Sequence, residues 1–115
     1  MRALALVDDL LMFSRIDAAA RDAGVSVERV GAPSQLPAPD EVDLLFVDCI
    51  TNIGEWGSDL VAWRAEGAGA VRVIAFGSHT DLDAHAAVRA LGFGPMWARS
   101  RLVRELPRLF TSASR

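Results

Sequence analysis

Three short apolar runs constrain the fold of this chain more than any other feature of its sequence. They occupy residues 3–7, 42–48 and 71–76, and each has the length of a β-strand rather than of a helix. Strands that are apolar almost throughout are typical of a parallel sheet covered by helices on both faces. The residues between them contain helix formers, with apolar positions near helical spacing in residues 10–23. We therefore expect an α/β fold.

Two further strands complete the expected sheet. Residues 25–30 alternate and are more polar, as in an edge strand, and residues 95–98 form a short strand suited to the opposite edge. Placing the three apolar strands in the centre predicts a five-stranded parallel sheet of order 2-1-3-4-5 with right-handed crossovers. Residues 31–41 carry three prolines, so the second helix is expected to be reduced or absent.

The later helices are expected to begin at hydroxyl residues, which accept hydrogen bonds from free amides of the first turn. Ser58 is the predicted cap of the helix that follows the third strand, and Thr80 that of a helix ending at Leu91. Ser100 is the predicted cap of the last helix, which Pro107 should bend or shorten.

Composition excludes several classes of protein. The 115 residues, 51% of them hydrophobic, suit one domain spanning residues 1–115. The net charge of −3 argues against a nucleic-acid partner, because it repels the phosphate backbone, and all basic residues are Arg. The lone Cys49 excludes an internal disulfide and a Cys-rich zinc site. No apolar stretch reaches the roughly 20 residues of a membrane span, so we expect a cytoplasmic protein without a membrane partner.

Carboxylates stand at the ends of two apolar strands. Asp8 and Asp9 follow the first strand, and Asp48 ends the third. The carboxyl ends of parallel strands share one edge of a sheet, where the strand order reverses, so these side chains are expected to meet in one crevice. Three carboxylates repel one another unless one is protonated or a cation is bound, and oxygen ligands suit Mg²⁺. The alternative is three solvated aspartates with weak cation affinity.

In these residues the chain resembles the receiver domain of two-component response regulators. The acidic pair of that family falls on Asp8 and Asp9, its phospho-acceptor on Asp48, and the segment ALGFGPMWARS aligns with its fourth helix and fifth strand. The resemblance implies that the acidic cluster binds Mg²⁺, with the backbone carbonyl of Ile50 as a further ligand. It also implies that Asp48 receives a phosphoryl group from a histidine kinase or a small phosphodonor.

Several positions depart from the family pattern. The hydroxyl position after the fourth strand falls on Gly77, and Ser78 comes one residue late. The lysine position falls on Arg99, and the aromatic position of the fifth strand falls on Met96. Arg99 keeps a positive charge but is larger and planar, and it could pair directly with Asp48. The chain therefore resembles an atypical receiver, or pseudo-receiver.

These observations favour a stand-alone, degenerate receiver-like signalling module that acts through protein–protein contacts and is not an enzyme. One alternative is a working phospho-accepting regulator, modified at Asp48. A more distant alternative is a flavodoxin-like ligand-binding or metal-dependent enzyme domain. That alternative calls for a glycine-rich phosphate loop after the first strand, which the sequence VDDLL lacks.

The last helix carries Arg101, Arg104 and Arg108 at helical spacing. Such a stripe is commonly solvated, but by the resemblance the surface of helix 4, strand 5 and helix 5 docks a target or a second copy. Acidic Asp81 and Asp83 could then pair with arginines of the partner in a homodimer. Among the aromatic residues, Trp56 in a glycine-rich loop is the candidate for binding, whereas Trp63 and Trp97 are expected to pack.

Overall fold

The computed structural model describes residues 1–49, 53–67 and 71–113. Five parallel strands form one sheet in the order β2-β1-β3-β4-β5, so the predicted strand order is confirmed. The strands are β1 (Ala3–Leu6), β2 (Val27–Arg29), β3 (Leu44–Asp48), β4 (Arg72–Gly77) and β5 (Trp97–Ala98). The three apolar strands lie in the centre, as their composition indicates, and the two short strands lie at the edges.

The described residues contain four α-helices, one fewer than a helix after every strand would give. They are α1 (Leu10–Asp22), α2 (Ile53–Ala65), α3 (Leu82–Ala90) and α4 (Arg99–Ala113). Two 3₁₀ turns, η1 (Pro33–Gln35) and η2 (Pro39–Glu41), replace a helix between β2 and β3, and each begins at a proline. The indole Nε1 of Trp63 donates a hydrogen bond of 2.7 Å to the carbonyl oxygen of Pro37, which fixes this connection against α2.

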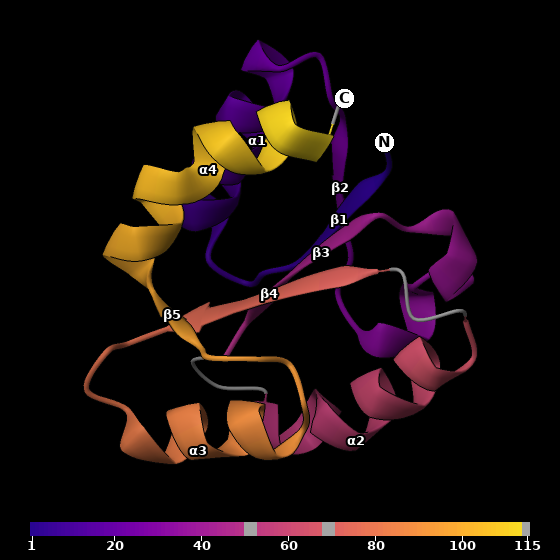
Figure 1. Cartoon of the computed structure of the whole chain (residues 1–115), viewed down its shortest axis with the longest axis vertical. Helices are drawn as coiled ribbons and strands as arrows, with labels where there is room; N and C mark the ends of the chain where they lie inside the picture. The colour runs from indigo at the N-terminus through magenta and orange to yellow at the C-terminus, as the bar shows by residue number, and fades with distance from the viewer. Residues whose placement is uncertain (50–52, 68–70, 114–115) are drawn as a thin grey trace.

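The sheet separates two helical layers. Helices α1 and α4 cover one face, and α2 and α3 cover the other (Figure 1). Side chains of the central strands alternate between the layers because successive residues of a strand point to opposite faces. In β3, for example, Phe46 packs with Ile16 and Phe110 on the α1/α4 side, whereas Leu45 packs with Leu60 on the α2/α3 side.

Helix α2 begins at Ile53, so the prediction that Ser58 caps it is wrong. Trp56, Leu60 and Trp63 are all buried at helical spacing, and this apolar face extends the helix toward its N-terminus. Trp56 therefore belongs to the core, and its predicted binding role is not supported by its position. A Cβ atom added at Gly57 would lie 2.7 Å from Leu91 Cδ1, so this glycine allows α2 to approach the end of α3 closely.

The two other predicted caps are also wrong. Helix α3 is capped by Asp81, whose carboxylate accepts a hydrogen bond of 3.1 Å from the Ala84 amide. Helix α4 already begins at Arg99, so Ser100 lies inside it, and the helix continues past Pro107 to Ala113 instead of being shortened there. At the start of α3 a hydroxyl and a carboxylate, Thr80 and Asp81, are adjacent. Both residue types are good helix caps, so the sequence alone does not decide between them.

Candidate functional site

Asp48 ends the central strand β3 and is deeply placed. It is the one charged side chain among the described residues that is buried, with 5% of its surface exposed. It lies opposite Phe76 of β4 in the parallel register, and β1 pairs with β3 on the other side. A buried carboxylate is costly unless other groups compensate its charge, so such a residue at a strand end marks a candidate site.

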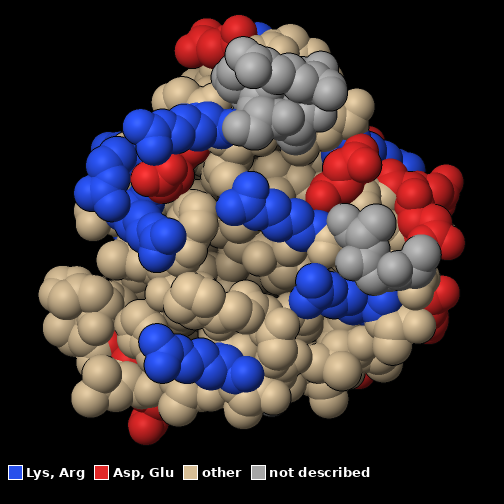
Figure 2. Space-filling view, viewed as in Figure 1, with Lys and Arg blue, Asp and Glu red and all other residues tan. Residues whose placement is uncertain are grey.

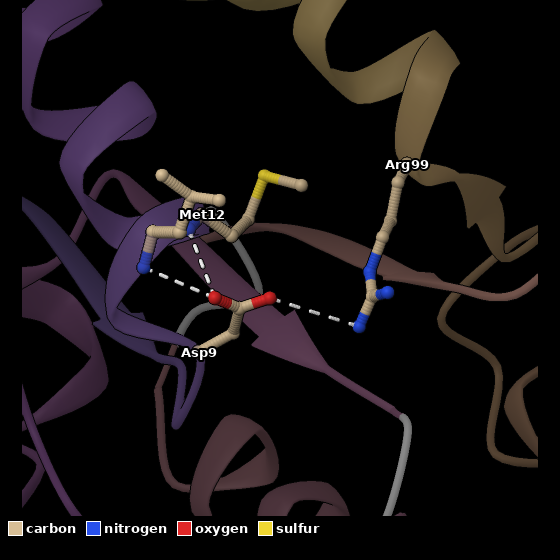
Figure 3. A network of polar contacts seen from close by, with 4 residues as sticks. Asp9, Met12 and Arg99 are labelled. Atoms are coloured by element: carbon tan, nitrogen blue, oxygen red, sulfur yellow. Dashed lines mark hydrogen bonds and ion pairs between the residues drawn. The ribbon is translucent and has the colours of Figure 1, made fainter.

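The acidic pair after β1 is divided between two environments. Asp8 is exposed, whereas Asp9 is the N-cap of α1. One carboxylate oxygen of Asp9, Oδ1, accepts hydrogen bonds from the amides of Leu11 (3.0 Å) and Met12 (3.2 Å). These bonds satisfy two of the free amides of the first helical turn and fix the carboxylate beside the crevice (Figure 3).

Arg99 reaches the same carboxylate from the opposite side. It follows β5 and opens α4, and its Nη2 lies 3.9 Å from Asp9 Oδ2 (Figure 3). This separation makes an ion pair but is too long for a hydrogen bond. The Nε atom of Arg99 is buried and has no hydrogen-bond partner. Arg99 therefore points toward the acidic edge of the sheet, as the sequence predicts. Its ion pair is with Asp9.

The described residues give only part of the Mg²⁺ site that the resemblance implies. Within the described ranges, no three His, Cys, Asp or Glu side chains are grouped so that they could hold a metal ion. Both oxygens of Asp9 are already engaged, one with α1 amides and one with Arg99. Ile50, the expected carbonyl ligand, lies outside the described residues. In this arrangement the positive charge that faces the Asp9 carboxylate is the Arg99 guanidinium.

Gly77 and Met96 occupy the positions where the family pattern calls for a hydroxyl and an aromatic ring. Met96 is buried, with 4% of its surface exposed. A Cβ atom added at Gly77 would lie 3.2 Å from both Cε and Sδ of Met96 and 3.8 Å from Cys49 Cβ. The thioether thus fills the space beside the Gly77 backbone, where a side chain at this position would begin.

Ser78 does not replace the missing hydroxyl in this structure. It is exposed, its Oγ lies 2.9 Å from Thr80 Oγ1, and it accepts a hydrogen bond of 3.3 Å from the Thr80 amide. These bonds form a local turn before α3. The sequence predicts Ser78 as an altered switch residue, and the structure places its hydroxyl in that surface turn.

The packing of Met96 on Gly77 predicts that restoring a hydroxyl destabilises the protein. Gly77→Ser should lower the free energy of unfolding by about 1 kcal/mol, because the end of Met96 must move by a few tenths of an ångström to admit the added atoms. Met96→Ala removes the obstructing atoms, so the double variant should be more stable than the sum of the single changes predicts, by about 0.5 kcal/mol or more. A urea-unfolding double-mutant cycle measures this coupling, and additive effects would contradict the contact.

Two basic residues that the sequence does not single out also lie at this edge. Arg29, which ends β2, donates a hydrogen bond of 2.8 Å from Nε to the carbonyl oxygen of Val7, next to the acidic pair. Arg15 lines a hollow together with Arg99. The sequence gives only a weak indication of this position for Arg15. The residue lies four positions after Leu11, so the two side chains share one face of α1.

The arginine stripe of α4 is partly neutralised by its own helix. Arg104 Nε and Arg108 Nη1 lie 3.9 and 3.8 Å from the carboxylate of Glu105, and Arg101 stacks 4.4 Å from the ring centre of Trp97. Figure 2 shows basic side chains surrounding an acidic one on the face where α4 lies. Such exposed pairs contribute little to stability, so this surface is free to exchange its contacts.

No family model and no curated protein matches the sequence. The structure, however, resembles solved receiver domains. A signal receiver domain from Vibrio parahaemolyticus has a TM-score of 0.68 at 16% identity, over 98% of this chain and 92% of that one. A response regulator from Thermotoga maritima has a TM-score of 0.68 at 15% identity, over 96% and 97%. The beryllofluoride-activated NtrC4 receiver domain dimer has a TM-score of 0.63 at 12% identity, over 95% and 98%.

These similarities confirm the receiver fold that the sequence predicts. At such identities they establish the fold rather than an activity. None of the described helices combines the length and the apolar character that crossing a membrane requires.

Proposed function

We propose that this chain is a receiver-type module of two-component signalling whose phospho-switch is degenerate, and that it acts through protein–protein contacts rather than as an enzyme. The packing of Met96 against Gly77 carries this proposal. A switch that reports phosphorylation by moving a hydroxyl inward lacks that hydroxyl here, and the adjacent space is filled. We further propose that residues 1–115 act as one domain in the cytoplasm.

Arg99 supports the same conclusion. Its guanidinium supplies a permanent positive charge to Asp9 at the edge of the sheet. Arg is larger than Lys and binds carboxylates through a planar fork, so it is not an equivalent substitute at a site that admits a phosphoryl group. The Asp9 carboxylate is thus paired with a positive charge supplied by the chain itself.

We place the contact surface on α3, β5 and α4, which correspond to helix 4, strand 5 and helix 5 of a receiver. Arg101 and Arg108 are exposed there, and Asp83 is exposed on α3, so opposite charges are available to a second copy. Asp81 is less suited to that pairing because its carboxylate caps α3. The NtrC4 receiver among the similar structures is a dimer, which supports a homodimer as one candidate assembly. A histidine kinase or a downstream target is the other candidate partner.

The test is the intact mass of the protein after incubation with Mg²⁺ and a small-molecule phosphodonor. We expect no added phosphoryl group under conditions that label an ordinary receiver domain, which serves as the positive control. The reason is that Asp9 and Arg99 hold each other at the crevice, where the family binds the cation.

Asp48→Asn is the matched variant for this experiment, since it keeps the shape of the side chain and removes its nucleophilic carboxylate. A phosphoryl adduct that is present in the natural chain and absent in Asp48→Asn would overturn the degenerate reading. It would show instead a working regulator modified at Asp48, which tolerates Gly77 and Arg99.

A further inference from the structure

A hollow of about 470 Å³ lies between the first turns of α1 and α4, beside the acidic crevice. Its volume falls within the range of small-molecule pockets. Leu11, Met12 and Val103 supply its apolar lining, and Arg15, Arg99 and Ser100 supply most of its polar lining. The hollow shares Asp9 and Arg99 with the acidic crevice, but Asp48 does not line it.

The charge of the hollow is unbalanced. Two guanidiniums, of Arg15 and Arg99, border it together with a single carboxylate, that of Asp9. This carboxylate is already shared between two amides of α1 and Arg99. No carboxylate of the described residues forms an ion pair with Arg15. The hollow therefore has more cationic donors than acceptors, which favours an anionic ligand.

Arg99 provides a second and more specific sign. Its Nε atom is buried without a hydrogen-bond partner, and its contact with Asp9, at 3.9 Å, is too long to be a hydrogen bond. The Nε atom itself is out of reach of solvent, so an anion in the hollow would contact the remaining N–H groups of this guanidinium, whose side chain is 40% exposed. The hollow also borders the N-terminal turn of α4, where the helix dipole favours negative charge.

The apolar lining defines the rest of the ligand. Leu11 points outward from the first turn of α1 with 69% of its surface exposed, and it borders the hollow beside Met12 and Val103. A small inorganic anion would leave these side chains in contact with water. A ligand with a short apolar chain would cover them and add a hydrophobic contribution to the charge interaction.

We propose that this hollow binds a small amphipathic anion, in which a carboxylate or phosphate group contacts Arg15 and Arg99 and a short apolar chain covers Leu11, Met12 and Val103. The anionic group lies between the two guanidiniums, and the apolar chain lies against α1 and α4. Binding there does not require phosphorylation of Asp48, which does not line the hollow. The inference does not rest on the proposed signalling function, since it depends only on the hollow.

The test is a titration of the isotope-labelled protein with hexanoate, followed by amide chemical shifts. We expect saturable shifts confined to residues 9–15 and 99–103, with a dissociation constant of roughly 1 mM for a ligand of this size. Arg15→Gln should weaken binding about two- to fivefold, because that guanidinium is exposed. Arg99→Gln should weaken it about tenfold, because this guanidinium is less exposed than that of Arg15 and its charge is less screened. Arg89→Gln, an exposed arginine on α3, is the control and should leave binding unchanged.

Three further probes separate the parts of the proposal. Hexyl phosphate should bind at the same residues, which extends the site to both anionic groups. Hexanol should bind much more weakly, and equal binding would overturn the role of charge. Inorganic phosphate should also bind more weakly than hexanoate, and equal binding would overturn the role of the apolar lining. Shifts that do not saturate, or that Arg15→Gln and Arg99→Gln leave unchanged, would overturn the site itself.

Discussion

Replacing Phe110 with alanine is expected to lower the free energy of unfolding by about 3–5 kcal/mol. Phe110 is fully buried near the end of α4, and its ring lies 5.9 Å from that of Phe46, at an interplanar angle of 45°. Phe46 sits in the middle of the central strand, so this contact attaches α4 to the centre of the sheet. Removing the ring leaves a cavity that the rigid sheet cannot close.

Urea unfolding followed by circular dichroism measures this effect. Arg108→Ala is the matched control on the same helix, because 81% of the Arg108 side chain is exposed and its ion pair with Glu105, at 3.8 Å, is long and solvated. Its cost should stay within about 0.5 kcal/mol. If Phe110→Ala cost no more than Arg108→Ala, the second half of α4 would not be packed on the sheet. The arginine surface of that helix would then have no fixed geometry.

The second large effect is a loss of stability at alkaline pH that comes from one thiol. Burial, reinforced by the nearby negative charge of Asp48, raises the pKa of Cys49 from 9.0 to about 12. The folded protein therefore keeps the thiol proton at a pH where the unfolded chain has lost it. Since the unfolded state then binds fewer protons, the free energy of unfolding falls as the pH rises from about 9 toward 12.

The composition makes this effect easy to isolate. The chain contains no Lys and no Tyr, so Cys49 is the only side chain whose ordinary pKa lies in this range, while arginine stays charged. The slope should approach about 1.4 kcal/mol per pH unit, which amounts to roughly 2–3 kcal/mol over two units. Urea unfolding at intervals between about pH 8 and pH 11 measures it.

Cys49→Ala is the control for the alkaline effect. This substitution removes the titrating thiol, so the free energy of unfolding of the variant should change little over the same pH range. The smaller side chain lowers that free energy by an amount that does not depend on pH. A thiol reagent gives an independent measurement, because Cys49 is 2% exposed and should react only as fast as the protein opens. Equal slopes in the natural chain and in Cys49→Ala would show that another group causes the loss.

The fold is largely predictable from the sequence because its strongest signals are local. Apolar runs of strand length identify the three central strands, and the prolines of residues 31–41 explain the missing second helix. The start of α2 is not predictable in the same way. Gly54 and Gly57 suggest a loop by propensity, but burial of Trp56 and the close approach of Leu91 to Gly57 override that preference.

The candidate site is predictable in outline but not in its pairings. Strand order alone places Asp9 and Asp48 at the same edge of the sheet. Arg99 contacts Asp9 rather than another carboxylate because of its side-chain torsions and because the helix cap fixes Asp9. The spacing of residues in the sequence predicts neither of these. The hollow beside Arg15 is also hidden from the sequence, since it forms between α1 and α4, which are far apart along the chain.

The contact between Met96 and Gly77 joins the side chain before β5 to the last residue of β4, so the two positions cannot be substituted independently. A Cβ atom at position 77 would lie 3.2 Å from the Met96 thioether, so a side chain there requires the end of Met96 to move by a few tenths of an ångström. The effect of a substitution at either position is therefore expected to depend on the residue at the other.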